Sequence, residues 1–258
     1  MSLESRVLSL ESAPRKVTTR SRKPFDSRRH PSDLPFVLVN MAMTADGKIA
    51  TANRAVSSFG SAHDHEHLLE LRATADTVMA GARTVDLNKI NLGPGAKRFR
   101  RLRLRRGLAE FNSRVIVSGS GSINPRADIF QHRFSPIIIL TTQRGSASRL
   151  CQLRTLADEV GVFGKTELNF RTALRWLCSR WGVKRLLCEG GGELNAALFR
   201  AGLVDELHLT ICPKIFGGRT APTVADGLGL FRLPNAALLK RKSIRRIGDE
   251  LFLVFVRD

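Results

Sequence analysis

The stretch Leu186-Leu-Cys-Glu-Gly-Gly-Gly-Glu-Leu194 decides the fold. An apolar run typical of a buried strand leads into three glycines, and a helical pattern follows over residues 193–200. Glycines after a strand let a ligand approach the backbone closely, and the N–H groups that open a helix attract phosphate. The spacing is neither G-x-G-x-x-G nor a P-loop, since no Lys-Ser/Thr pair follows. The stretch therefore predicts a strand–turn–helix unit that binds phosphate, with a plain tight turn as the alternative.

The same alternation of strand and helix patterns runs through most of the chain. Strands are predicted at 36–40, 77–80, 114–118, 136–141, 160–163, 184–188, 205–211, 237–243 and 250–257, and helices at 61–73, 170–181 and 193–200. Strands that alternate with helices predict an α/β fold whose central sheet is mostly parallel, with helices on both faces. The last strands follow one another without helices, which predicts an antiparallel C-terminal edge.

Length and charge bound the class of protein. The chain has 258 residues, with 42 Lys or Arg against 23 Asp or Glu, and a formal net charge of +19 that favours anionic partners. Residues 1–33 are rich in Arg, Ser and Lys and are predicted to be a disordered basic arm, with a transit peptide as the alternative. Residues 34–258 are predicted to form a single domain. No apolar run reaches the roughly 18–20 residues of a membrane span, and we expect a cytoplasmic protein without a membrane partner.

Cysteine and histidine patterns argue against a metal site. Cys151, Cys178, Cys188 and Cys212 form no C-x-x-C pair, so neither a structural zinc site nor the zinc site of a deaminase is expected. Cys188 and Cys212 lie in apolar runs and are predicted to be small core residues. In His63-Asp-His-Glu-His67 two histidines lie four residues apart, but the stretch is not H-E-x-x-H and no cysteine pattern supplies further ligands. We therefore expect a solvated first helical turn and no metal.

Three more loops rich in Gly, Ser or Thr follow predicted strands. They are Asn40-Met-Ala-Met-Thr-Ala-Asp-Gly-Lys-Ile49, Thr77-Val-Met-Ala-Gly-Ala-Arg-Thr-Val85 and Ser118-Gly-Ser-Gly-Ser122. Gly81 permits close backbone approach, and Arg83 offers phosphate a fixed charge on a planar fork. Because ligands of open α/β sheets bind outside the carboxyl ends of the strands, we expect these loops to form one site.

Five motifs in a fixed order resemble those of the riboflavin-biosynthesis pyrimidine reductases, most of all the stand-alone type. They are Met43-Thr-Ala-Asp-Gly-Lys-Ile-Ala50, Leu71-Arg-Ala-Thr-Ala-Asp76, Met79-Ala-Gly-Ala-Arg-Thr-Val85, Glu189-Gly-Gly-Gly192 and Val204-Asp-Glu-Leu…Ile211-Cys-Pro-Lys-Ile-Phe-Gly-Gly218. The resemblance covers about 35–258. It implies a dihydrofolate-reductase-like fold, a homodimer and NADPH as cofactor. The implied reaction reduces the ribosylamino side chain of a pyrimidine 5′-phosphate to a ribitylamino chain, with deamination left to a separate deaminase.

The resemblance also implies roles for single residues. It places cofactor contacts at Gly81, Arg83, Thr84, Asn88, Ser118, Gly190, Gly191, Gly192, Glu193 and Leu194, with Ser118 near the adenosine 2′-phosphate. On the substrate side it places Asn40, Thr44, Asn88, Asp46 and Glu189. Of these, Asp46 and Glu189 are the candidates to supply or orient a proton as catalytic carboxylates.

One segment departs from the family pattern. Where the family continues with Asp-Asp-Pro-x-Leu, this chain has Asn88, Lys89 and Ile90, and only Leu92 is retained. An amide can hydrogen-bond but cannot accept a proton as a carboxylate does. The departure leaves the preferred substrate open, and a pteridine or dihydrofolate-type reductase on the same fold is the alternative function.

The run Lys97-Arg-Phe-Arg-Arg-Leu-Arg-Leu-Arg-Arg106 holds seven basic residues in ten. We interpret it as a solvated, extended loop, so neutralising Arg100, Arg101 and Arg103 is expected to leave turnover nearly unchanged. Two alternatives remain: phosphate contact at the site, and a non-enzymatic protein that binds polyanions through this run and the arm. No nucleic-acid-binding motif surrounds the run, so a nucleic-acid partner is not expected.

Overall fold

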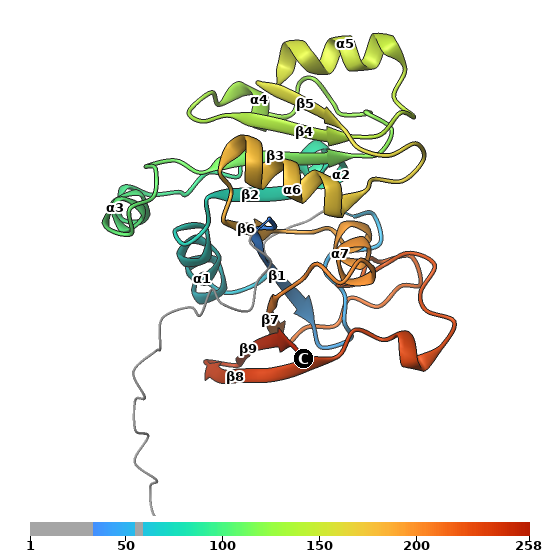
Figure 1. Cartoon of the computed structure of the whole chain (residues 1–258). Coiled ribbons are helices and arrows are strands. Elements are labelled where there is room, and N and C mark those ends of the chain that lie inside the picture. The colour runs from blue at the N-terminus through green and yellow to red at the C-terminus, as the bar shows by residue number, and fades with distance from the viewer. Residues whose placement is uncertain (1–32, 55–58) are drawn as a thin grey trace, which may run out of the picture. The chain divides into compact units, whose positions relative to one another are not determined.

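A nine-stranded sheet forms the centre of the molecule (Figure 1). The computed structural model describes residues 33–54 and 59–258, so the predicted arm, apart from Asp33, lies outside the described residues and its boundary stays a prediction. The strands are β1 (Phe36–Thr44), β2 (Thr77–Gly81), β3 (Ser113–Ser118), β4 (Ile137–Thr141), β5 (Glu159–Val162), β6 (Arg185–Cys188), β7 (Glu206–Cys212), β8 (Leu239–Ile247) and β9 (Glu250–Arg257).

The sheet has the order β5-β4-β3-β2-β6-β1-β7-β9-β8. Strands β1 to β7 pair in parallel. Strand β9 runs antiparallel to β7, and β8 runs antiparallel to β9. The predicted mostly parallel sheet with an antiparallel C-terminal edge is confirmed.

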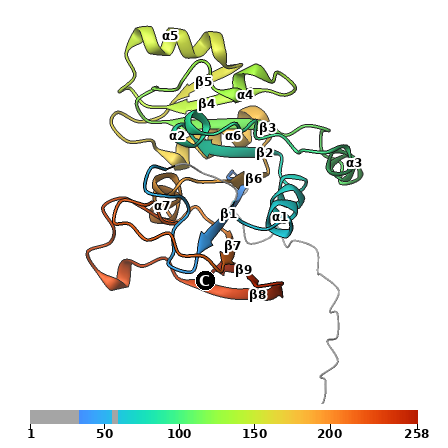
Figure 2. The same cartoon turned by 180° about the vertical axis from the view of Figure 1, so that it is seen from behind.

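Helices cover both faces of the sheet, as predicted. They are α1 (Ala62–Arg72), α2 (Ala82–Leu87), α3 (Lys97–Arg105), α4 (Asp128–Gln131), α5 (Ala147–Leu156), α6 (Phe170–Trp181) and α7 (Gly192–Arg200). Helices α6 and α7 pack on the face seen in Figure 1, and α1 and α2 on the face seen in Figure 2.

Alternate strand residues feed two apolar cores. On β2, Met79 joins the core under α6 and α7, whereas Val78 and Ala80 join the core on the opposite face. On β4, Ile138 and Ile139 divide in the same way. Side chains of a strand alternate between faces, and a sheet covered on both faces is apolar at every position. The short continuous apolar runs of the sequence have this origin.

The predicted solvated, extended loop at 97–106 is wrong. Most of the run forms α3, in which Phe99 is 4% exposed and Arg103 only 1% exposed, while Arg98 and Arg101 face solvent. Residues 99 and 103 are four apart and so share one face of the helix. That face lies against the end of α1, where Arg103 donates to the backbone oxygens of Arg72 and Ala75. The expectation that Arg103 is dispensable therefore no longer holds.

Other differences from the predicted elements have local causes. Helices α2, α4 and α5 are not predicted by the sequence pattern, and α2 and α4 span only six and four residues. Strand β8 is longer and begins later than the predicted 237–243, and most of its residues are exposed. Because β8 is not buried on either face, its sequence lacks the alternation that marks a strand.

The start of α1 shows why that helix begins where predicted. The Ser61 side chain accepts hydrogen bonds from the N–H groups of His63 and Asp64. In a capping box the side chain at the third helical position, here Asp64, would accept a hydrogen bond from the N–H of the N-cap residue. In this protein the Ser61 N–H instead donates to the Glu250 carboxylate of β9, at 2.8 Å. The N-cap thus also fastens α1 to the antiparallel edge.

In the part of the chain that the structure describes, no helix is long and apolar enough to cross a membrane.

Candidate active site

A cleft of about 870 Å³ opens where the chain leaves β2, β3 and β6. Its volume lies in the range of small-molecule sites. All four glycine-, serine- or threonine-rich loops of the sequence contribute to its walls. The predicted site residues in the lining are Gly81, Arg83, Thr84, Asn88, Ser118, Gly191, Gly192, Glu193 and Leu194. Gly190 and the predicted substrate-side residues Asn40, Thr44, Asp46 and Glu189 lie outside it.

The three glycines after β6 differ in whether neighbouring atoms leave room for a side chain. Gly190 has φ +78°, and a Cβ there would lie 2.8 Å from the Met41 sulfur. A Cβ at Gly192 would lie 2.4 Å from the backbone oxygen of Thr223. At Gly191, in contrast, the nearest atom would be the Thr84 hydroxyl oxygen at 3.7 Å, an ordinary contact. Packing therefore requires the first and third glycines, and the protein itself gives no steric reason for Gly191.

The N-terminus of α7 opens into this cleft without a side-chain cap. Its N-cap is Gly191, and Glu193 lies in the first turn. The first N–H groups of a helix have no partner within the helix, and the positive end of the dipole attracts anions. Glu193 forms a 3.6 Å ion pair with Arg83 of α2, in which both side chains are more than half exposed. An exposed pair of this kind is weak, and an anionic ligand can displace it.

Helix α2 provides the opposite wall. Asn88, directly after α2, donates its side-chain amide to the backbone oxygen of Thr84 at 2.7 Å. Burial raises the pKa of Asp86, and the hydrogen bond from the Asn124 N–H acts in the opposite direction. The helix therefore presents backbone, hydroxyl and amide groups to the cleft.

Ser118, which the resemblance places near a cofactor phosphate, lines the cleft and also holds its own loop. Its hydroxyl donates to the backbone oxygen of Ser122 at 3.1 Å, and the residue is 6% exposed. Ser120 and Ser122 are the more exposed serines of this loop, and both line the cleft. Ser118 thus shapes the loop that its neighbours offer to a ligand.

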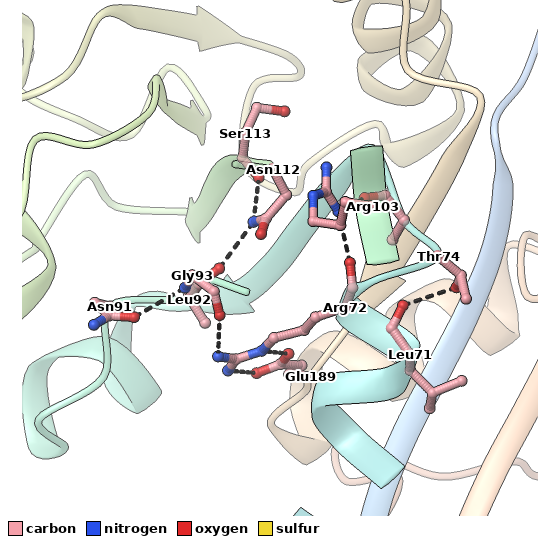
Figure 3. A network of polar contacts seen from close by, with 11 residues as sticks. Leu71, Arg72, Thr74, Asn91, Leu92, Gly93, Arg103, Asn112, Ser113 and Glu189 are labelled. Carbon is pink, nitrogen blue, oxygen red and sulfur yellow. Dashed lines mark hydrogen bonds and ion pairs between the residues drawn. The ribbon is translucent and has the colours of Figure 1, made fainter. Parts of the chain in front are cut away.

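Glu189 lies beside the glycine loop in a network of polar contacts (Figure 3). Two nitrogens of Arg72 donate to its carboxylate at 2.6 and 2.7 Å, and a third donates to the backbone oxygen of Gly93 at 2.6 Å. The Arg72 and Glu189 side chains are each 11% exposed. Bidentate pairs of this type fix the plane of a carboxylate.

Asp46 is committed to backbone structure. Its carboxylate accepts hydrogen bonds from the Thr44 hydroxyl and from the N–H groups of Phe216 and Gly217. The hydrogen bond from the Thr44 hydroxyl is the largest cause that lowers the pKa of Asp46. Burial opposes it, and the N–H groups of Gly217 and Phe216 lower this pKa further. Thr44 itself is fully buried and caps the turn through the Lys48 N–H. The two residues tie the turn after β1 to the segment after β7.

Asn40 offers an acceptor that the described residues leave unsatisfied. It is 7% exposed on β1, opposite His208 of β7, and its side-chain oxygen has no hydrogen-bond partner among the described residues. Buried acceptors are rarely left unpaired in native proteins. This oxygen can receive a donor from a ligand.

Sequence reasoning missed several arginines. Arg54, Arg171 and Arg200 line the cleft, and Arg72 holds Glu189. Arg72 falls within the quoted motif at 71–76, so membership in a family motif was the one signal that could have indicated it.

The remaining chemistry-bearing residues have structural partners. His67 Nε2 lies 3.1 Å from His208 Nδ1, and His208 in turn contacts Glu206. Among the described residues, no group of three or more His, Cys, Asp or Glu could hold a metal ion. Cys188 and Cys212 are fully buried, as predicted, and burial raises the pKa of each thiol to about 12.

A mostly parallel sheet with helices on both faces, an antiparallel C-terminal edge and a cleft at the strand ends defines a dihydrofolate-reductase-like α/β protein. The chain belongs to the RibD C-terminal domain family, which matches residues 35–253. The resemblance drawn from the sequence motifs is thereby confirmed.

Known relatives agree with this assignment. The chain is 31% identical over 228 residues to the 2,5-diamino-6-ribosylamino-4(3H)-pyrimidinone 5′-phosphate reductase of Methanothermobacter thermautotrophicus, covering 86% of this chain and 97% of that protein. A pyrimidine reductase-like protein of Corynebacterium diphtheriae has a TM-score of 0.70 at 20% identity, covering 87% of this chain and 92% of that one. RibD of Acinetobacter baumannii has a TM-score of 0.68 at 18% identity, covering 88% of this chain but only 58% of that one. The two structures share the fold.

Proposed function

We propose that the protein is an NADPH-dependent reductase of riboflavin biosynthesis. It reduces the ribosylamino group of a phosphorylated pyrimidine to a ribitylamino group. The bound cofactor would supply the hydride to C1′ of the open-chain imine form of the substrate, and water would supply the proton that the imine nitrogen takes up to become the amine. The family membership and the relative from Methanothermobacter support the substrate class.

One observation carries the proposal from the structure. The α7 N-terminus opens into the cleft at Gly191, where the protein has room for a side chain. Uncapped N–H groups and close backbone access suit the pyrophosphate of a dinucleotide. Gly81, Thr84, Asn88 and the first turn of α7 would hold it.

NADPH is proposed over NADH because arginines line the same cleft. An additional phosphate could use Arg83, Arg54, Arg171 and Arg200, which line the same cleft as the 118–122 loop. We expect NADPH to bind at least tenfold more tightly than NADH in calorimetry. Equal affinities would contradict this choice.

Glu189 is the carboxylate that we propose to act on the substrate. Its plane is fixed by Arg72, so it orients the substrate by accepting hydrogen bonds, with Asn40 offering a second acceptor nearby on the sheet. Asp46, the other candidate, uses its carboxylate to hold a turn. We assign Asp46 and Thr44 to shaping the site because Asp46 binds the segment after β7, whereas Glu189 directly precedes the glycine loop whose Gly191 lines the cleft.

The test is NADPH consumption with three substrates in parallel. We expect turnover with 2,5-diamino-6-ribosylamino-4(3H)-pyrimidinone 5′-phosphate, and we use its deaminated uracil counterpart and dihydrofolate as comparisons. Turnover with dihydrofolate alone would favour the pteridine-type alternative, which Asn88 in place of a family Asp keeps open. No turnover with any of the three would reject a reductase of this class.

The active form is proposed to be a cytoplasmic homodimer that works with a separate deaminase. Leu228, Phe231 and Leu233 lie in one segment and are 89%, 93% and 88% exposed. Apolar side chains gathered in this way mark an interaction surface. We expect light scattering to give twice the chain mass, and Phe231→Asp to give monomers. A wild-type monomer would contradict the dimer.

A further inference from the structure

The two faces of helix α3 differ in what their basic side chains contact. On the inner face Phe99 and Arg103 are buried, and Arg103 donates to backbone oxygens at the end of α1. Arg101 lies two residues from each of them, so it points about 200° away around the helix. Lys97 and Arg105 lie four residues before and after Arg101 and therefore share its face. These three exposed residues form the outer row of α3.

The outer row has no compensating negative charge. Among the described residues, no carboxylate forms an ion pair with any of its three side chains. The neighbouring arginines do have partners: Arg98 pairs with Glu66 and Arg100 with Glu110, each at 3.0 Å. The three like charges follow one another at about 6 Å along the helix axis. Like charges four residues apart destabilise a helix, and an anionic partner would relieve this repulsion.

We propose that the outer row of α3 binds the phosphate backbone of a nucleic-acid strand. Phosphates repeat along a strand, and a row of Lys and Arg that neutralises several of them binds without regard to sequence. Arg101 and Arg105 can each meet a phosphate with a planar fork. Lys and Arg clustered along one helix of a strongly basic protein are typical of nucleic-acid binding, and this chain has a formal net charge of +19.

The other side chains of α3 favour phosphate contact over two other modes of binding. The one apolar side chain near the outer row is Leu104, which is 54% exposed. A single leucine does not give the broad apolar face that holds a helix in a lipid surface. The one aromatic residue of α3, Phe99, faces inward, so the helix offers bases no ring to stack on. The strand is therefore bound through its backbone alone.

The helix changes the expectation drawn from the sequence. The basic run was expected to be a solvated loop without a nucleic-acid partner, and a loop would not align its charges. In α3 the same residues divide into a buried side and a regular exposed row (Figure 1). The cleft lining includes no residue of α3, so the proposal is independent of the proposed reductase. We expect NADPH and nucleic acid to bind at the same time.

The first experiment measures the fluorescence anisotropy of a labelled single-stranded RNA of mixed sequence on titration with the full chain. The test variant neutralises the outer row through Lys97→Gln, Arg101→Gln and Arg105→Gln. The control variant removes the same charge from exposed arginines in and just before α5, through Arg144→Gln, Arg149→Gln and Arg154→Gln.

The two variants should differ clearly. At about 0.1 M salt the test variant should bind RNA at least about tenfold more weakly than wild type, since three phosphate contacts are lost. The slope of log affinity against log salt should also become shallower by about 2. The control should bind within about threefold of wild type, because exposed charges away from the contact act only through a screened field. Equal losses in the two variants, or no RNA binding by the wild type, would overturn the proposal.

Competition identifies the class of anion. An unlabelled RNA of unrelated sequence should displace the bound RNA as well as an unlabelled copy of the same RNA does. Poly-glutamate at the same concentration of charge should displace it poorly, since its carboxylates do not repeat as backbone phosphates do. Equal displacement by poly-glutamate would overturn the assignment and favour an acidic protein segment.

Photocrosslinking needs no variant, so it does not depend on how the variants fold. Wild-type protein with RNA that contains 4-thiouridine should crosslink within residues 97–106, with or without NADPH. Crosslinks confined to residues 1–33 or to other surfaces would overturn the proposal. In the test variant the affinity for NADPH should equal that of wild type, and a loss would contradict the independence of the two sites.

Discussion

The two sides of the glycine loop after β6 are built in opposite ways. On the cleft side, α7 starts at an uncapped Gly191, where an added Cβ would have no neighbour closer than 3.7 Å. On the other side, the Glu189 carboxylate is held by Arg72, which in turn is held through its backbone by Arg103. Open backbone groups suit a ligand that brings its own charge, and a clamped carboxylate suits a substrate that must be oriented. From this difference we propose that one side of the loop binds the cofactor and the other side positions the substrate.

The largest expected effect is on the clamped side. Arg103→Met leaves the backbone oxygens of Arg72, Ala75 and Ala109 without their buried donor. Leaving buried acceptors unpaired should lower the free energy of unfolding by about 4 kcal/mol. Urea unfolding measures this, with the exposed Arg101→Met expected to lie within about 0.5 kcal/mol of wild type. Equal stabilities for the two variants would break the comparison.

The cleft side should respond in affinity and not in stability. In Gly191→Val, methyl groups fill the space that phosphate oxygens would use, and we expect NADPH affinity to fall about 100-fold, the loss of one to two charge-assisted hydrogen bonds. The unfolding midpoint should stay at its wild-type value. Gly192→Ala is the control, because its Cβ meets the Thr223 backbone oxygen and should lower stability. Tight NADPH binding by folded Gly191→Val would contradict the assignment.

A smaller effect concerns the sheet beneath α1. Burial alone would raise the pKa of Glu206, but hydrogen bonds from His208 and Lys242 outweigh it and lower this pKa from 4.5 to about 2. A carboxyl with a lower pKa in the folded state stabilises the fold above its unfolded pKa. We therefore expect about 2 kcal/mol of stability to be lost as the pH falls from about 4.5 to about 2, allowing for solvent screening at the Lys242 end. In Glu206→Gln, the stability measured by circular dichroism should no longer fall in this way between pH about 4.5 and about 2. A variant with the wild-type dependence of stability on pH would contradict the role of Glu206.

Local patterns predicted the strands and the loops of the cleft, because both depend on residues close in sequence. The apolar runs and the glycines at 190–192 are of this kind. The clamp was not predictable, since Arg72 and Glu189 lie 117 residues apart and Arg103 meets Ala75 across 28. Seven basic residues in ten are typical of a solvated loop, and only the C-terminal oxygens of α1 make burial of Arg103 favourable.

Asp46 illustrates the same limit for function. The family resemblance made Asp46, in the turn after the first strand, a candidate catalytic carboxylate. The N–H groups that donate to this carboxylate belong to Phe216 and Gly217, 170 and 171 positions later in the sequence. Glu189 and Asp46 are alike in sequence context. Their long-range partners differ: the Arg72 side chain binds the Glu189 carboxylate, whereas backbone N–H groups after β7 bind the Asp46 carboxylate.

The central claim is that binding and positioning are divided across the glycine loop. The most direct test measures kcat and the KM for NADPH for Gly191→Val and Arg72→Lys in one assay with the phosphorylated pyrimidine. The account predicts a KM raised at least tenfold with kcat nearly kept in Gly191→Val, and a kcat lowered about tenfold with KM kept in Arg72→Lys. The same kinetic parameter changing in both variants would contradict the division.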